Sequence, residues 1–358
     1  MKAVIIAGGL GTRLRPLTYN TPKPIVPVAN RPFIVHQIEL LKQHGVTEVI
    51  LNLHYLPEAI KMALGDGSDL GVKIFYSIEV DPLGTAGAVK NAEEFFANYN
   101  EPLIVFNGDI LTDINISKVV ELHKKKKAKA TLTLTPVEDP TAYGLVLTEE
   151  DGRVTSFLEK PSFEQVEGLT KTEINAGIYI LDPKIFKNVP KNVRYMFEHD
   201  LFPKLLADGE KVYGYTSERF WLDIGNNKKY KIAHEAILRG EVAVRIFGTR
   251  EKGGYWVGKE SRIAKSSKVF GNSLIGEKVR IQENSIIKDY SVLGERTFVG
   301  SNATLDHTIV WQGCQIGDHV SLTDCVIGFN CRIESNCSLS GVVLADHSVI
   351  AKGTIMNV

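Results

Sequence analysis

A six-residue repeat in the C-terminal part of the chain constrains its fold more than any other feature. Aliphatic residues recur at every sixth position, at Val257, Ile263, Val269, Ile275, Ile281, Ile287, Leu293, Val299 and Leu305. The series continues to Ile350, with three steps shortened to five residues, and a small residue follows most of the aliphatics four positions later. Repeats of this kind wind a parallel β-helix, with three hexads in each triangular coil. Residues 257–350 therefore predict about five coils of a left-handed parallel β-helix.

The cysteines of the chain all lie among these repeats. They occur without a Cys-x-x-Cys pair, which indicates neither a zinc knuckle nor a disulfide framework. Three of them occupy the small-residue position of their hexads, where a free thiol behaves as a small buried hydrophobe. We therefore expect Cys314, Cys331 and Cys337 to face the interior of the coils.

Three histidines of the repeats raise a second possible activity, because a histidine can act as the base of an acyltransferase. Acyltransferases of this fold carry a long loop that interrupts a coil, whereas no sizeable insertion interrupts the repeats here. We therefore expect His307, His319 and His347 at corners or on the surface. A bifunctional enzyme whose β-helix transfers an acyl group remains an alternative.

The first part of the chain has a different periodicity. Short β-branched runs at 3–7, 49–53, 72–76 and 103–106 alternate with helical patterns at 33–44, 57–64 and 86–99. This alternation predicts an α/β fold, a Rossmann-like domain with a mainly parallel mixed sheet that binds ligands at the carboxyl ends of its strands. The sequence thus predicts a catalytic domain at 1–240, a linker at 241–256 and the β-helix at 257–358.

Composition and charge narrow the functional classes. The 42 basic and 42 acidic residues cancel, which argues against a nucleic-acid partner or an acidic membrane bound through a positive field. The first apolar run is too short for a signal peptide, and no segment reaches the length of a membrane span. We therefore expect a cytoplasmic protein.

A glycine-rich segment follows the first predicted strand. It reads Gly8-Gly9-Leu10-Gly11-Thr12-Arg13 and is followed by Thr21-Pro22-Lys23-Pro24. Glycines directly after a buried strand let backbone N–H groups approach a phosphate, and the basic side chains add charge. The P-loop pattern is absent, and Leu14 occupies the place of the third glycine of the dinucleotide pattern.

The whole set of motifs resembles the sugar-1-phosphate nucleotidyltransferase family. Besides the glycine-rich segment, the resemblance covers the motifs at 81–87, 107–109, 159–161, 175–177 and 220–225, in the family's order. The Pro-Leu-Gly-Thr-Ala-Gly loop at 82–87 and the hexapeptide repeats make the chain most similar to the mannose-1-phosphate guanylyltransferases (GDP-mannose pyrophosphorylases). The resemblance implies attack by the phosphate of a hexose 1-phosphate on the α-phosphorus of a nucleoside triphosphate, with release of pyrophosphate. GTP and mannose 1-phosphate are the favoured substrates.

The resemblance also implies a role for individual residues. Asp109 and Asp223 would bind Mg²⁺. Arg13 and Lys23 would hold the triphosphate and act as catalytic residues together with the two aspartates. The nucleotide would contact Ala7, Gly8, Gly9, Gly11, Thr12, Gly84, Thr85, Asn107 and Gly108. The sugar phosphate would contact Gly144, Glu159, Lys160, Asn175 and Gly177.

Two alternatives to guanylyl transfer stay open. One is a nucleotidyltransferase that uses glucose 1-phosphate with UTP, dTTP or ATP. The other is a non-catalytic regulatory subunit of such an enzyme, although the basic and acidic site residues are all present. In each case we expect a homo-oligomer that associates through the β-helix, because a repeat solenoid offers long flat faces.

Overall fold

The structure is a computed structural model that describes residues 1–169 and 171–358. The chain divides into two compact units. The first, which we call the sheet unit, comprises Met1–Gly9 and Ile34–Asp223. The second, the repeat unit, comprises Leu10–Phe33 and Ile224–Val358. The glycine-rich segment after the first strand, Leu10–Phe33, is called the signature segment below. It belongs to the same compact unit as the repeats.

The sheet unit is built on one nine-stranded mixed sheet, with the order β10-β9-β11-β6-β1-β4-β5 and with β8 and β12 beyond β11. Its parallel core contains the four strands that the sequence predicts: β1 (Lys2–Ile6), β4 (Glu48–Leu53), β5 (Lys73–Ile78) and β6 (Leu103–Asn107). The other strands are β8 (Ala130–Pro136), β9 (Gly144–Thr148), β10 (Val154–Glu159), β11 (Glu173–Leu181) and β12 (Val212–Thr216). Strand β11 pairs antiparallel with β6 and so joins the four parallel strands to β8, β9, β10 and β12.

Three helices of the sheet unit lie where the sequence predicts them: α1 (Phe33–Gln43), α2 (Pro57–Leu64) and α3 (Gly84–Asn91). The others are α4 (Ile116–Lys126), α5 (Phe163–Val166) and α6 (Phe202–Ala207). The pattern predicted at 86–99 ends early, since α3 stops at Asn91 and only a short 3₁₀ turn follows. Apolar residues on one side of the sheet, among them the cross-strand neighbours Val4, Val105 and Tyr179, form one buried core.

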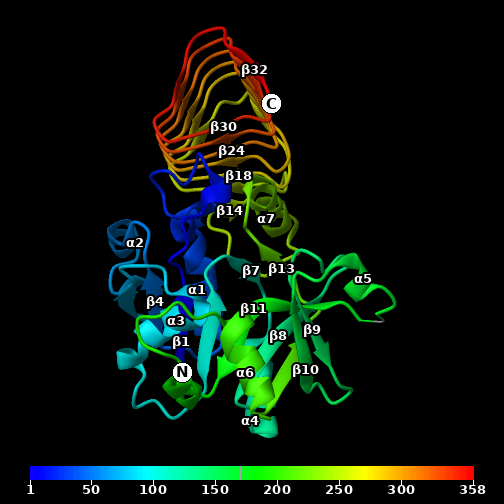
Figure 1. Cartoon of the computed structure of the whole chain (residues 1–358). Helices are drawn as coiled ribbons and strands as arrows, with labels where there is room; N and C mark the ends of the chain where they lie inside the picture. Colours follow the sequence, from blue (N-terminus) through cyan, green and yellow to red (C-terminus); the bar gives the residue numbers. More distant parts are fainter. Residues whose placement is uncertain (170) are drawn as a thin grey trace. The chain divides into compact units, whose positions relative to one another are not determined.

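The repeat unit contains a β-helix, so the left-handed β-helix that the hexads predict is confirmed (Figure 1). Its strands form three parallel sheets, named here by their first coil strand. The β15 face contains β15 (Trp256–Val257), β18 (Leu274–Ile275), β21 (Val292–Leu293), β24 (Ile309–Val310), β27 (Val326–Ile327) and β30 (Val343–Leu344). The β16 face contains β16 (Arg262–Ile263), β19 (Arg280–Ile281), β22 (Phe298–Val299), β25 (Gln315–Ile316), β28 (Arg332–Ile333) and β31 (Val349–Ile350). The β17 face contains β17 (Lys268–Val269), β20 (Ile286–Ile287), β23 (Thr304–Asp306), β26 (Ser321–Thr323), β29 (Ser338–Ser340) and β32 (Ile355–Asn357).

The interior of the coils follows the sequence prediction. The repeating aliphatics and all four cysteines are packed in one buried cluster. The three five-residue steps fall at the same corner of successive coils, because Leu305, Leu322 and Leu339 are stacked in register. His307, His319 and His347 lie at exposed corners with positive φ angles.

The β15 face differs from the other two in its outward residues. The first residue of each two-residue strand points away from the coil interior, because side chains alternate along a strand. On the β15 face these residues are apolar and most are buried, as at Leu274, Val292, Ile309 and Val326. Helix α7 (Asn227–Arg239) lies on this side, since its Lys231 pairs with Asp324 at the corner before β27. The apolar face is therefore covered within the repeat unit.

Two short elements complete the fold. Strand β14 (Thr249–Arg250) pairs antiparallel with β15, inside the stretch predicted as a linker. In the signature segment, β2 (Pro27–Val28) and β3 (Arg31–Pro32) form a hairpin whose two turn residues, Ala29 and Asn30, have φ angles of 48° and 62°. Positive φ at both positions is the type I′ geometry of tight hairpins. The boundaries predicted at 240 and 257 stay a prediction, and the compact units divide the chain at other points.

Candidate active site

The loops after β1 and β6 meet at the carboxyl edge of the parallel strands. The backbone N–H of Gly108 donates to the carbonyl of Ile6 at 2.8 Å. A Cβ atom at Gly108 would lie 2.6 Å from that carbonyl oxygen, so only glycine allows this approach. Three residues predicted to bind the nucleotide, Ala7, Asn107 and Gly108, are thus brought together where an α/β sheet presents its ligands.

Asp109 follows directly and is held by a side chain that the sequence analysis did not identify. The Gln37 amide of α1, 2% exposed, donates to the carbonyls of Asn107 at 3.0 Å and Ile110 at 2.8 Å. It therefore fixes the backbone on both sides of Asp109. No local pattern distinguishes Gln37 from the other polar residues of its helix.

Asp223 reaches the same place through a small two-stranded sheet. Strand β13 (Trp221–Asp223) pairs antiparallel with β7 (Ile110–Thr112), and Asp223 lies opposite Ile110, the residue after Asp109. Both carboxylates are half-buried. Two carboxylates at adjoining positions of paired strands suit a hard cation that prefers oxygen ligands and keeps several waters, which is how Mg²⁺ is usually bound. The residues present therefore fit the predicted metal.

Glu159 and Lys160 stand at the end of β10. Glu159 lies opposite Gly144 in the β9–β10 pair, and a Cβ atom at Gly144 would be 2.9 Å from the Glu159 carboxylate. The backbone N–H of Lys160 donates to the Tyr143 carbonyl at 2.9 Å. Lys160 has a φ angle of 48° and an exposed side chain. An exposed ammonium group here is accessible to a phosphate.

A chain of hydrogen bonds runs from Asn175 to Thr85. The Asn175 amide donates to the Tyr179 hydroxyl at 2.7 Å, and this hydroxyl donates to Glu198 at 3.3 Å. The Thr85 hydroxyl donates to the other Glu198 oxygen at 3.0 Å. Burial raises the pKa of the Glu198 carboxyl, and the negative charge of Glu159 raises it further. The network therefore connects Thr85, predicted to bind the nucleotide, to Asn175, predicted to bind the sugar phosphate.

Tyr179 and Glu198 are functional candidates that the sequence analysis missed. Tyr179 contacts Asn175, four residues earlier, because the strand register shifts between them, and the sequence pattern does not indicate that shift. Glu198 lies in a short π-helical turn at Phe197–Leu201, 113 residues from its partner Thr85. Nothing near it in the sequence indicates that contact.

Gly177 lies where the register between β8 and β11 shifts. Its φ angle is 73°, and a Cβ atom would lie 2.6 Å from the Asn107 amide nitrogen. The Trp221 indole N–H donates to the neighbouring Ala176 carbonyl at 2.8 Å, which ties β13 and its Asp223 to β11. Residues of the predicted nucleotide, metal and sugar-phosphate sites thus converge on one edge of the sheet unit.

The loop at 82–87 packs against residues 195–197. Gly84 has a φ angle of 74° and begins α3. The backbone N–H groups of Ala86 and Gly87 both donate to the Tyr195 carbonyl, at 3.0 and 2.9 Å. The Glu79 carboxylate accepts from the Leu83 N–H at 3.1 Å, and burial raises its pKa. This frame holds Gly84 and Thr85 in place.

Four predicted site residues belong to the repeat unit, namely Gly11, Thr12, Arg13 and Lys23. Within the signature segment the Thr18 hydroxyl donates to the Gly11 carbonyl at 2.8 Å. A Cβ atom at Gly11 would lie 3.1 Å from the Lys23 Cβ, so the two ends of this loop are closely packed. Thr12 and Arg13 are exposed, and Lys23 is half-buried. Gly8 and Gly9 end the sheet-unit part of the chain just before this segment.

Two family models match the chain. Residues 2–240 match the family model described as nucleotidyl transferase, and residues 252–356 match the model described as the EIF2B subunit epsilon LbH domain. A UTP–glucose-1-phosphate uridylyltransferase of a Synechocystis species is 37% identical over 72% of this chain and 69% of its own length. A mannose-1-phosphate guanylyltransferase of Mycobacterium tuberculosis is 38% identical over 66% of this chain and 65% of its own length. The chain thus spans about two thirds of the length of these relatives.

Two solved structures are also similar to this chain. The crystal structure of HddC from Yersinia pseudotuberculosis is 31% identical, has a TM-score of 0.56 and covers 65% of this chain and 97% of its own. A second structure of HddC, complexed with GMP-PN, has a TM-score of 0.55. Within residues 1–169 and 171–358, no helix is long and apolar enough to cross a membrane.

Proposed function

Because the chain belongs to the nucleotidyl transferase family, we propose that it joins a nucleoside triphosphate to a hexose 1-phosphate and releases pyrophosphate, with GTP and mannose 1-phosphate as its favoured substrates. The observation that carries this proposal is the β7–β13 pairing, which places Asp109 and Asp223 at adjoining positions. The guanylyltransferase relatives and the Pro-Leu-Gly-Thr-Ala-Gly loop at 82–87 favour GTP and mannose 1-phosphate over other substrates.

In the proposed reaction, a phosphate oxygen of the hexose 1-phosphate attacks the α-phosphorus. The bond from the α-phosphorus to the oxygen that bridges to the β-phosphorus breaks, and that oxygen leaves with pyrophosphate. The attacking oxygen is already anionic, so the protein needs no general base and catalysis depends on positioning and charge neutralisation. Bound between Asp109 and Asp223, Mg²⁺ would supply positive charge for the phosphate oxygens.

The side chains of the site divide these tasks. Lys160, exposed at the end of β10, would bind the sugar phosphate. The Glu159 carboxylate would accept hydrogen bonds from sugar hydroxyls, and the Asn175 amide would donate to them or accept from them. Arg13 and Lys23 of the signature segment would neutralise charge on the triphosphate and on the leaving pyrophosphate. Tyr179 and Glu198 would orient Asn175 and Thr85 through the hydrogen bonds that join them.

A matrix assay tests the proposal. Each of GTP, UTP, dTTP, ATP and CTP is combined with mannose 1-phosphate and glucose 1-phosphate, and pyrophosphate release is measured with Mg²⁺ present. We expect the highest kcat/KM with GTP and mannose 1-phosphate. Highest activity with glucose 1-phosphate would instead support the second candidate, which the 37% identical uridylyltransferase favours. No release with any pair would overturn the enzyme proposal in favour of a regulatory subunit.

We also propose that the chain forms a homo-oligomer through the β-helix. Its last coils carry exposed apolar side chains, with Val349 67% and Ile355 74% exposed. Apolar groups at the end of a solenoid are usually covered by a cap or a partner. Light scattering on the full chain tests this: Val349→Glu with Ile355→Glu should lower the molar mass, and an unchanged mass would exclude this surface. The cytoplasmic location stays a prediction.

A further inference from the structure

Hydrogen bonds within the repeat unit attach the signature segment to the β-helix. The most buried of them run through Tyr230 of α7, which is 0% exposed, and Trp311, which is 1% exposed and follows β24. The Trp311 indole N–H donates to the Tyr230 hydroxyl at 2.8 Å, and this hydroxyl donates to the Pro27 carbonyl. One phenol therefore links a coil of the β-helix to the backbone four residues after Lys23.

Two further contacts reach other coils. The Asn30 amide, at the turn of the β2–β3 hairpin, donates to the Leu293 carbonyl of β21 at 2.8 Å. The hydroxyl of Thr21, two residues before Lys23, donates to Asp346 at 3.2 Å. On the other side of the loop, the Asn227 amide of α7 donates to the Arg15 carbonyl at 3.3 Å. Arg13 and Lys23 thus lie in a loop that hydrogen bonds join to α7 and to the β-helix. These bonds involve the backbone carbonyls of Arg15 and Pro27 and the side chains of Thr21 and Asn30.

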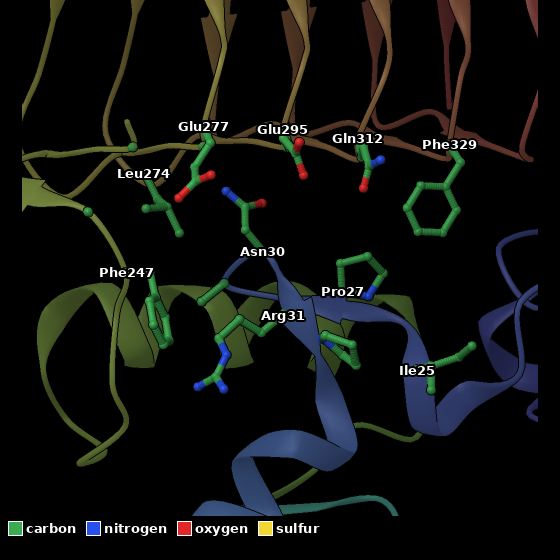
Figure 2. Close-up of a pocket in the computed structure, with 16 residues that line it drawn as sticks. Ile25, Pro27, Asn30, Arg31, Phe247, Leu274, Glu277, Glu295, Gln312 and Phe329 are labelled. Atoms are coloured by element: carbon green, nitrogen blue, oxygen red, sulfur yellow. The ribbon is translucent and has the colours of Figure 1, made fainter. Parts of the chain in front are cut away.

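The remaining space beside the hairpin is open. A cavity of about 340 Å³ lies between the hairpin and the coil corners, and Figure 2 shows Glu277 and Glu295 on either side of Asn30 and Gln312 opposite Pro27. The hairpin is buried on its other side, where Val26 and Val28 are 0% exposed, and hydrogen bonds join its tip and base to the β-helix and α7. Because the cavity leaves room on one side, loss of one such bond should let the hairpin shift toward the open space.

We propose that Tyr230 and Trp311 are positioning residues, which hold the signature segment and its Arg13 and Lys23 on the β-helix. In this role the β-helix is part of the machinery that binds the triphosphate, besides any role in assembly. The expected effect on the KM for the triphosphate rests on the proposed function. The attachment itself does not, and it can be measured without substrate.

A matched pair of substitutions tests the inference on the full chain. Tyr230→Phe removes one phenolic hydroxyl between α7 and the β-helix. Tyr290→Phe removes another, which accepts from Arg239 of α7 at 3.1 Å and belongs to a ring that lies beside His307 and Arg239. We expect Tyr230→Phe to speed amide hydrogen exchange in residues 11–30 and to raise the KM for the triphosphate about fivefold, which corresponds to about 1 kcal/mol, the typical contribution of one of the two hydrogen bonds lost. The KM for the hexose 1-phosphate should not change, and Tyr290→Phe should behave as wild type.

A general loss of stability would lower the active fraction and leave both KM values unchanged, so the separation of the two KM values identifies a positioning effect. Asn30→Gly is a second, milder variant, because glycine retains the positive φ while the amide is lost. Wild-type exchange in residues 11–30 for both variants would overturn the inference, as would an equal effect of Tyr290→Phe. If wild type releases no pyrophosphate, the proposed function fails while the exchange experiment still tests the attachment.

Discussion

Replacing Asp109 and Asp223 by asparagine is the most direct test of the active-site assignment. The two residues are 114 positions apart in sequence and meet only because Asp223 pairs opposite Ile110. Asparagine keeps the shape of aspartate and removes one negative charge. Each substitution should therefore weaken the binding of the metal ion and misplace the α-phosphate, while the β7–β13 backbone pairing stays intact.

The expected magnitude follows from the shared position. Removing one well-placed electrostatic stabiliser typically lowers kcat by about 10²–10³, which is roughly 3–4 kcal/mol. If the two groups acted independently, their effects would multiply and the double variant would lose a factor of about 10⁴–10⁶ in kcat. Groups that act on one ion are strongly non-additive, and adjoining ligands leave little function for the second substitution to remove. We therefore expect the kcat of the double variant to be only slightly lower than that of the less active single variant.

The assay measures kcat by pyrophosphate release for both single variants and the double variant at saturating substrates, across a Mg²⁺ titration, with thermal melts alongside. Asp182→Asn is the control, because Asp182 is a half-buried carboxylate of the same unit that pairs with Lys129 at 2.8 Å outside the site. It should retain kcat. Near-wild-type turnover in either single variant, or fully multiplicative losses in the double variant, would refute the shared-metal assignment.

The remaining predictions concern four single side chains. Lys160→Ala should raise the KM for hexose 1-phosphate with little effect on that for the triphosphate, and steady-state kinetics with an unchanged sugar-phosphate KM would exclude the role. Burial raises the Glu198 pKa, so wild-type stability should fall as pH rises above about 4.5, and Glu198→Gln should gain on wild type in urea melts toward pH 8; parallel profiles would contradict this. Burial lowers the His123 pKa to about 4, so stability should fall by about 3 kcal/mol from pH 6.5 to 4, and melts of His123→Gln should lack this loss. Gly177→Ala should cost about 1–2 kcal/mol at its positive φ and displace Asn107, which thermal melts and the KM values would detect.

Local patterns in the sequence were sufficient for most secondary structure and for the residues that carry motifs. The parallel core strands and the coils follow from periodicity, because buried strands and hexads each impose a spacing on apolar residues. The site residues in the motifs follow from family resemblance, and the sheet topology explains why Asp109, Glu159 and Asn175 share an edge. Gln37 and Glu198 could not be predicted, since their partners lie 70 and 113 residues away and each looks like an ordinary polar residue of its helix.

The position of the signature segment was also outside the reach of local patterns, yet the repeats contain a signal for it. The inward residues repeat on every face, but the residue before each of them is apolar in every coil only on the β15 face, at Trp256, Leu274, Val292, Ile309, Val326 and Val343. The equivalent residues on the other faces are mostly charged or polar. A solenoid exposed on all sides has no reason to keep one apolar face, because burying a large aliphatic side chain stabilises by about 1.5–3 kcal/mol only where something covers it. An outward apolar period of three hexads therefore predicts a cover from the same chain or a partner. In this protein the cover is α7 with the signature segment, so a substitution on that face should affect the placement of Arg13 and Lys23 as well as the β-helix.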